Sequence, residues 1–294
     1  MFESFNRSIE ITKISFGVLL KDKELLLFPL IAGIFSFMFF IAMVFPFIIS
    51  EIVSQFVGGV VGGIINIIAV FVLYLGLAFI ATFFNTCVVY TIKKRFEGGN
   101  ATFFESIGFA LSKIHLILAW SLVSATVGLI LNILSNFAEK LGPIGKLVMN
   151  LVVGFLGGIW AIITIFVVPA MVYDGVGPLA AIKSSVETLK KTWGESLIRH
   201  IGLGLFQTVL VVFGIVAWVV LFILSIIIFP LLIIPITLLL FAYIIVIALL
   251  FGVLNTIFNT ALFVYAKTGT VPMGYSPELM QNAFKVQEKK KGLF

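Results

Sequence analysis

The feature that most constrains this chain is a series of long stretches without a single Asp, Glu, Lys or Arg. They cover residues 25–50, 52–92, 116–138, 147–173 and 201–266. An α-helix rises about 1.5 Å per residue, so about 20 apolar residues cross a hydrocarbon core about 30 Å thick. Every stretch is long enough for a crossing, and we expect an all-α, polytopic membrane protein. The composition agrees, since 61% of the residues are hydrophobic and only 11% are charged.

The number of crossings depends on how the two longest stretches divide. The last one is interrupted by Phe229-Pro230 and by Pro235. Because proline lacks a backbone donor and restricts the residue before it, two helices are expected to join there. The stretch at 52–92 is short for two crossings and a turn, and its start, Gly58–Gly63, is expected to be a loop leading into one long helix. The sequence therefore predicts six transmembrane helices.

The orientation of the six helices follows from the distribution of positive charge, because Lys and Arg of short loops stay on the cytoplasmic side. With the N-terminus inside, 17 of the 19 Lys and Arg residues are cytoplasmic, and only Lys140 and Lys146 are outside. We expect a multi-pass protein of the plasma membrane with both termini in the cytoplasm. Residues 267–294 would form a basic cytoplasmic tail, and no cleavable signal peptide is expected at the N-terminus.

Three cytoplasmic segments are predicted to form amphipathic helices. Residues 102–114 carry apolar side chains at helical spacing, and Thr102 and Glu105 have the spacing of a capping box. Residues 177–194 have Pro178 at an expected first helical position. The N-terminus has a weaker apolar stripe of the same kind.

Each amphipathic segment leads into a pair of crossings, which predicts a threefold repeat of surface helix, crossing, crossing. The repeats would cover 1–92, 93–173 and 174–266, together forming a single integral membrane domain over 1–266. The surface helices either lie in the headgroup region, with their lysines toward anionic lipid, or pack on one another as a cytoplasmic layer. The predicted interfacial residues are Lys21, Lys23, Lys183, Lys190, Lys191, Trp193 and Arg199.

An Asn-Thr pair recurs at equivalent ends of crossings two and six, in TFFNTCVVY (82–90) and TIFNTALFVY (256–265). Crossing four has Pro169 in place of the pair. Polar side chains in lipid seek partners on other helices, and such bonds contribute well under 2 kcal/mol each. They therefore either hold helices together or line a path for a ligand. The candidate residues are Asn66, Asn85, Thr86, Gln207, Asn255, Asn259 and Thr260.

Two motifs resemble those of a known family. SFGVLLKDKELLLFPLIAG (15–33) and VPAMVYDGVGPLAAIKSSVETLKKTWGESL (168–197) are similar to the two signatures of a family of prokaryotic polytopic membrane proteins classed only as a domain of unknown function. The resemblance implies a six-span architecture. It implies no activity, cofactor or catalytic residue.

The inventory of reactive side chains argues against an enzyme. Only two histidines are present, His115 and His200, and both precede crossings beside basic residues, as interface anchors do. One cysteine, Cys87, excludes an intrachain disulfide. No acidic residue lies within a predicted crossing, which argues against proton coupling. We expect no catalytic residue, cofactor or metal, and no nucleic-acid partner.

Two functional hypotheses remain. The first is a passive conduit, or a permease that binds lipid or a small solute, with an amide-lined path opened by helix interruptions near Pro46, Pro169, Pro230 and Pro235. The second is a structural or interaction protein that organises the membrane or a membrane-protein partner through its basic cytoplasmic helices. Membrane lipids are the expected partners in both.

Overall fold

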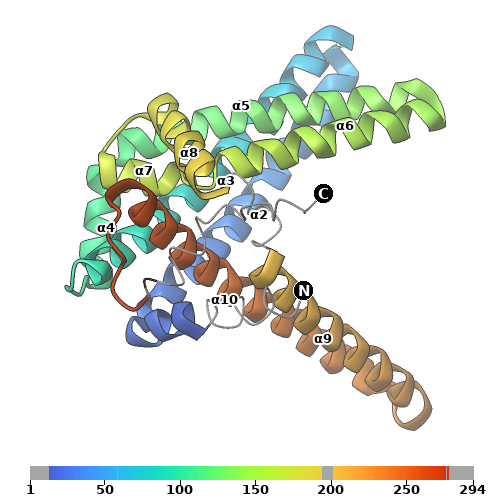
Figure 1. The fold of residues 1–294 in the computed structure, drawn as a ribbon. Coiled ribbons are helices and arrows are strands. Elements are labelled where there is room, and N and C mark those ends of the chain that lie inside the picture. The colour runs from blue at the N-terminus through green and yellow to red at the C-terminus, as the bar shows by residue number, and fades with distance from the viewer. Residues whose placement is uncertain (1–12, 58, 194–200, 276, 278–294) are drawn as a thin grey trace, which may run out of the picture. The chain divides into compact units, whose positions relative to one another are not determined.

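The computed structural model describes residues 13–57, 59–193, 201–275 and 277. Every regular element within these ranges is a helix, in agreement with the predicted all-α class (Figure 1). The chain divides into two compact units. We call Leu27–Leu189 the central unit, and Met1–Leu26 together with Lys190–Phe294 the terminal unit. The single domain predicted over 1–266 and the threefold repeat stay predictions.

The central unit begins with a helical hairpin of α2 (Leu27–Val57) and α3 (Gly59–Phe96). The single long helix expected over 52–92 is confirmed, but the expected loop is wrong for Gly59–Gly63, which belongs to α3. Glycine costs up to about 1 kcal/mol in a helix. In an apolar environment, however, each unsatisfied backbone group costs several kcal/mol, so continuing the helix is favourable.

A second hairpin in the central unit consists of α5 (Ile114–Ala138), η2 (Glu139–Leu141) and α6 (Gly142–Ile163). Its turn depends on Gly142, whose φ of 72° and ψ of 177° lie in a region that is essentially open to glycine alone. The stacked rings of Trp120 and Trp160, with centroids 5.8 Å apart, join the two helices.

The interruption expected near Pro169 is present, a few residues before the proline itself. Helix α6 ends at Ile163, and α7 (Val167–Asp174) begins after a short break. Pro169 is the third residue of α7, where a backbone N–H would have no helical partner in any case. Pro46, by contrast, lies inside α2 without interrupting it.

The predicted amphipathic helices over 102–114 and 177–194 are present as α4 (Phe103–Ser112) and α8 (Pro178–Trp193). The capping box of α4 is confirmed: the Thr102 backbone N–H donates to the Glu105 carboxylate at 2.7 Å, and the Glu105 backbone N–H donates to the Thr102 hydroxyl at 3.3 Å. Hydrogen bonding of the Glu105 carboxyl to Thr102, first to its backbone N–H and second to its side chain, lowers the pKa of that carboxyl.

The terminal unit contains α9 (Ile201–Ile228), η3 (Pro230–Leu232) and α10 (Ile233–Thr268), together with a helix over 13–21 and η1 (Lys23–Leu26). The predicted join between two helices is found at Phe229, whose extended backbone precedes Pro230. The Tyr243 ring packs where a Cβ on Gly214 would stand, and its hydroxyl donates to the Leu210 carbonyl at 2.8 Å.

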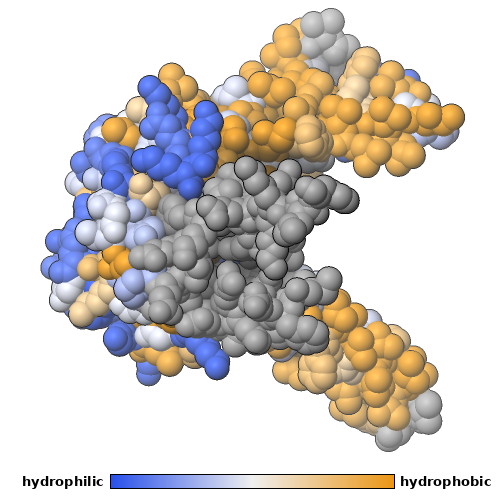
Figure 2. All heavy atoms as spheres, in the orientation of Figure 1, coloured by the Kyte–Doolittle hydropathy of each residue, from blue (hydrophilic) through white to orange (hydrophobic). Residues whose placement is uncertain are grey.

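Five stretches of the described residues are long and apolar enough to cross a membrane: Lys23–Val53, Val61–Phe96, Ile114–Asp174, Phe206–Ile226 and Pro230–Thr268. Figure 2 shows hydrophobic side chains along α5 and α6 of the central unit and hydrophilic ones around α4 and α8. Along α9 and α10 the surface is again hydrophobic. Apolar side chains thus face outward over most of the helical length, as they do in a membrane protein.

Candidate functional site

The first polar candidate, Asn66, belongs to a cluster that joins the two helices of the α2–α3 hairpin. The buried Ser50 hydroxyl donates to the Asn66 side-chain oxygen at 3.0 Å, and the Asn66 amide donates to the Glu51 carboxylate at 3.5 Å. Both partners come from α2. Asn66 therefore acts as a link between helices in this structure.

The Asn-Thr pair of α3 divides into two different environments. The Thr86 hydroxyl, which is buried, donates to the Thr82 carbonyl of its own helix at 2.8 Å. Such a bond satisfies the donor of the hydroxyl within one helix. Asn85 is half-buried, and its amide has no hydrogen bond to another described residue.

The Asn-Thr pair of α10 repeats this arrangement within the terminal unit. The buried Thr260 hydroxyl donates to the Thr256 carbonyl at 2.7 Å. Asn255 and Asn259 are half-buried and lie one turn apart, and Gln207 of α9 is half-buried as well. No hydrogen bond joins these three amides to other described residues. The role of the amides as a path lining stays a prediction.

The predicted interfacial lysines lie at the surface. Lys21, Lys23, Lys183 and Lys190 are exposed. Lys191 is exposed too, and its ammonium donates to the Ala266 carbonyl in the last turn of α10 at 3.4 Å. A cation is favourable there because helix carbonyls carry partial negative charge at that end. The Trp193 side chain, Arg199 and His200 lie outside the described residues, and His115 is exposed at the start of α5.

Sequence reasoning missed the hydroxyls that fasten α4 and α8 to the central unit. Ser106 of α4 and Thr91 of α3 are 2.8 Å apart and buried, and the Ser185 hydroxyl of α8 accepts from the Phe166 backbone N–H at 3.1 Å. The signal was present, because Ser106–Ala110 and Ala181–Ser185 each place two small residues one turn apart. Ala110 belonged to the predicted apolar stripe, whereas Ser106, Ala181 and Ser185 lie beside the stripes and were not considered as packing residues.

Some apolar side chains of the two surface helices nevertheless remain exposed. Phe104 of α4 is 82% exposed and Leu179 of α8 is 78% exposed. Both side chains belong to the predicted apolar stripes.

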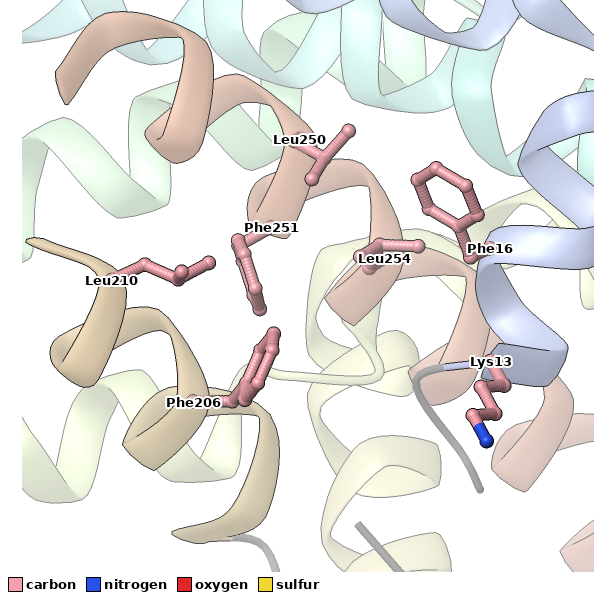
Figure 3. A pocket seen from close by; sticks show the side chains of 7 residues that line it. All are labelled: Lys13, Phe16, Phe206, Leu210, Leu250, Phe251 and Leu254. Atoms are coloured by element: carbon pink, nitrogen blue, oxygen red, sulfur yellow. The ribbon is translucent and has the colours of Figure 1, made fainter. Parts of the chain in front are cut away.

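A pocket in the terminal unit was also missed, because it combines three segments that are far apart in the sequence (Figure 3). Its volume is about 270 Å³, and almost all of its surface is apolar. Phe206 of α9 and Phe251 of α10 pack against one another in its wall, with ring centroids 6.0 Å apart. The lining residues are Lys13, Phe16, Phe206, Leu210, Leu250, Phe251 and Leu254.

Lys13 contributes the single charged side chain among the described lining residues, and it comes from the helix over 13–21. That helix is fastened to the C-terminal part of the unit by a buried hydrogen bond of 3.0 Å between the hydroxyls of Ser15 and Tyr275. Burial raises the pKa of the Tyr275 hydroxyl, and the Ser15 hydrogen bond opposes that rise. Figure 3 shows the Lys13 side chain pointing away from the Phe206 and Phe251 rings, so its ammonium lies at the outer edge of the pocket.

Ionisable side chains do not gather elsewhere as metal ligands would: no three His, Cys, Asp or Glu side chains of the described residues converge. The described part of the chain therefore offers the apolar pocket, rather than a cluster of acids and bases, as its candidate site.

Comparison with known proteins identifies a family without an assigned activity. A family model described as "Family of unknown function (DUF6159)" matches residues 64–273. This range includes the second sequence motif, at 168–197, and begins after the first, at 15–33. No curated protein and no solved structure matches the chain.

Proposed function

This chain belongs to that family of unknown function, and because the family has no activity to transfer, we propose from the residues themselves that the protein binds membrane lipid. The ligand site is the pocket between α9, α10 and the helix over 13–21. The protein holds lipid without a catalytic step, a cofactor or a metal, and membrane lipids are its partners.

The observation that carries this proposal is the combination of an apolar pocket wall with a cation at the rim. A hydrocarbon chain is stabilised by roughly 25 cal/mol for each Å² of apolar surface removed from water. A polar solute gains little in the same place, since buried polar groups need hydrogen-bond partners. The three amides of the terminal unit, Gln207, Asn255 and Asn259, are not among the described lining residues.

A six-helix topology is part of the proposal. The 61-residue stretch Ile114–Asp174 contains both helices of the α5–α6 hairpin, so it crosses twice while the other four stretches cross once. With the positive charges inside, both termini lie on the cytoplasmic side of the plasma membrane. The surface helix and its pair of crossings repeat three times, over 1–92, 93–173 and 174–266.

Helices α4 and α8 lie in the cytoplasmic headgroup region under this proposal. The exposed Phe104 and Leu179 support that position, because a helix buries its apolar face by about 5–10 Å in this region. A packed cytoplasmic layer would instead cover both side chains. The exposed Lys183 and Lys190 face anionic lipid.

A structural protein is the second candidate, and the Asn66 cluster favours it. Asn66 bonds to Ser50 and Glu51 across the hairpin, as a residue that only fastens helices would. Thr86 and Thr260, which bond within their own helices, also need no ligand. The two functions differ in whether the terminal-unit pocket holds lipid.

Native mass spectrometry of the gently solubilised protein tests this difference. We expect wild type to retain lipid and Leu250→Trp, which fills the pocket, to lose it. Leu249→Trp makes the same change one residue away, at a half-buried position outside the described lining. It should retain lipid, and circular dichroism should show equal helix content in all three forms. Wild type without lipid, or equal retention in all three forms, would favour the structural protein.

A further inference from the structure

We propose that the ligand of the terminal-unit pocket is an anionic lipid, with one hydrocarbon chain against the apolar wall that includes Phe206 and Phe251 and its acidic headgroup on the Lys13 ammonium. This inference rests on the proposed function and adds the chemical class of the lipid and the residue that selects it.

The pocket admits a part of a lipid rather than a whole molecule. Its volume is about 270 Å³, below the roughly 300–1,000 Å³ of pockets that enclose a complete drug-sized ligand. Phe206, Phe251 and Leu254 supply apolar walls from two helices. A section of one hydrocarbon chain matches both the size and the chemistry, and the remainder of the lipid stays in the bilayer.

The charge of the headgroup follows from the rim. Lys13 is exposed, and no ion pair joins it to an acidic side chain among the described residues. No described lining residue is acidic. A cation beside apolar surface is stabilised by a nearby anion more strongly than in bulk water, because the local dielectric constant is lower. An acidic headgroup therefore complements this rim better than a zwitterionic one, which brings a cation of its own.

Lys13 is held in place by the fold of the terminal unit. It lies two residues before Ser15, which is hydrogen-bonded to Tyr275, and the Val18 side chain lies 3.8 Å from the position a Cβ on Gly274 would take. These contacts join the helix over 13–21 to the segment after α10. The helix that carries Lys13 is therefore positioned relative to the pocket by residues about 260 positions away in the sequence.

A second groove in the same unit makes the role of Lys13 clearer by contrast. This groove, about 500 Å³, lies along α9 and α10, and its described lining residues include no charged side chain. Trp218 and Tyr243 supply its polar atoms, and both already donate hydrogen bonds, to Thr237 and to the Leu210 carbonyl. Of these two sites, the pocket beside Lys13 is the one with a charged side chain that can distinguish headgroups.

The test is a competition between phosphatidylglycerol and phosphatidylcholine with matched acyl chains. The full-length protein is placed in nanodiscs with equal amounts of both lipids, and the retained lipids are counted by native mass spectrometry. We expect wild type to prefer phosphatidylglycerol about fivefold, as one lysine near a membrane surface provides. Lys13→Gln should abolish the preference while total lipid stays the same, and Lys13→Arg should keep it. The matched control is Lys267→Gln, an exposed lysine of the same unit outside the described pocket lining, which should behave as wild type.

The outcomes separate this inference from the function on which it rests. If wild type retains no lipid, the proposed function fails. If wild type retains lipid without preference, or if Lys13→Gln keeps the preference, the anionic-lipid inference is wrong and lipid binding stands. If Lys267→Gln loses the preference as fully as Lys13→Gln, general surface charge explains the preference and the specific site is wrong.

Discussion

The α5–α6 and α9–α10 hairpins have the same topology, but the turn of the first is charged and the turn of the second is apolar. The α5–α6 turn carries Glu139, Lys140 and Lys146, and the Lys146 ammonium lies 3.4 Å from the Glu139 carboxylate. The α9–α10 turn carries Phe229, Pro230 and Leu231, the last 70% exposed, with no charged residue anywhere in 201–266. A charged turn is stable in water, whereas an apolar one is stable in lipid or against another apolar surface. Two hairpins with the same helix pattern therefore need not place their turns at the same depth in a membrane.

The interiors of the two hairpins differ as well. Trp120 and Trp160 join α5 to α6 by stacking of their rings. Trp218 instead donates a hydrogen bond of 3.3 Å to the Thr237 hydroxyl, and Tyr243 donates to the Leu210 carbonyl. The α9–α10 hairpin thus satisfies the donors of these two aromatic side chains internally. That arrangement suits helices whose whole length is apolar.

The largest expected effect is a difference in accessibility between the two turns. With Cys87→Ala as background, we expect Lys140→Cys to react with a membrane-impermeant maleimide added to intact cells. Leu231→Cys should react at least about tenfold less, because apolar surroundings exclude the reagent and disfavour the thiolate. Detergent solubilisation should remove the difference. Equal labelling in intact cells would break the comparison, and labelling of neither would overturn the proposed orientation.

A medium effect is expected from two matched glycine substitutions. Gly214→Ala places a Cβ within the Tyr243 ring, so the ring must move and its hydrogen bond is disturbed. Overpacking of this kind costs about 1–3 kcal/mol. Gly157→Ala places a Cβ 3.8 Å from Leu131, an ordinary contact, and should change stability by less than about 0.5 kcal/mol.

Thermal unfolding of the purified proteins in one detergent measures this pair. If Gly157→Ala lowered the melting temperature more than Gly214→Ala does, the two hairpins would pack in another way. The hairpin contrast would then rest on the turns alone.

The smallest effect is expected at the ion pair of the α5–α6 turn. Glu139→Gln removes the carboxylate, but both side chains are more than half exposed. Exposed pairs contribute about 0–1 kcal/mol, so the melting temperature should change little, and added salt should reduce even that change. A large loss of stability would show that the pair organises the turn, a role assigned here to Gly142.

Much of the fold was readable from local patterns. The charge-free stretches predicted the long helices, the Thr102 and Glu105 spacing predicted the cap of α4, and Phe229-Pro230 predicted the join between α9 and α10. Each depends on residues near one another in the chain, where backbone hydrogen bonding and proline geometry decide the outcome. The loop predicted over Gly59–Gly63 is wrong because backbone groups in an apolar environment must be hydrogen-bonded, and this requirement outweighs the low helix propensity of glycine.

The sequence by itself determined the helical membrane character of this protein and the positions where its helices start, stop and reverse, because these follow from hydrophobicity and short-range backbone chemistry. Only the tertiary structure decided which polar groups meet. Asn66 is hydrogen-bonded to Ser50, and Ser185 to the Phe166 backbone. Lys13 borders a pocket whose other lining residues include Phe206 and Phe251. Such contacts depend on packing between distant segments, which no local spacing encodes.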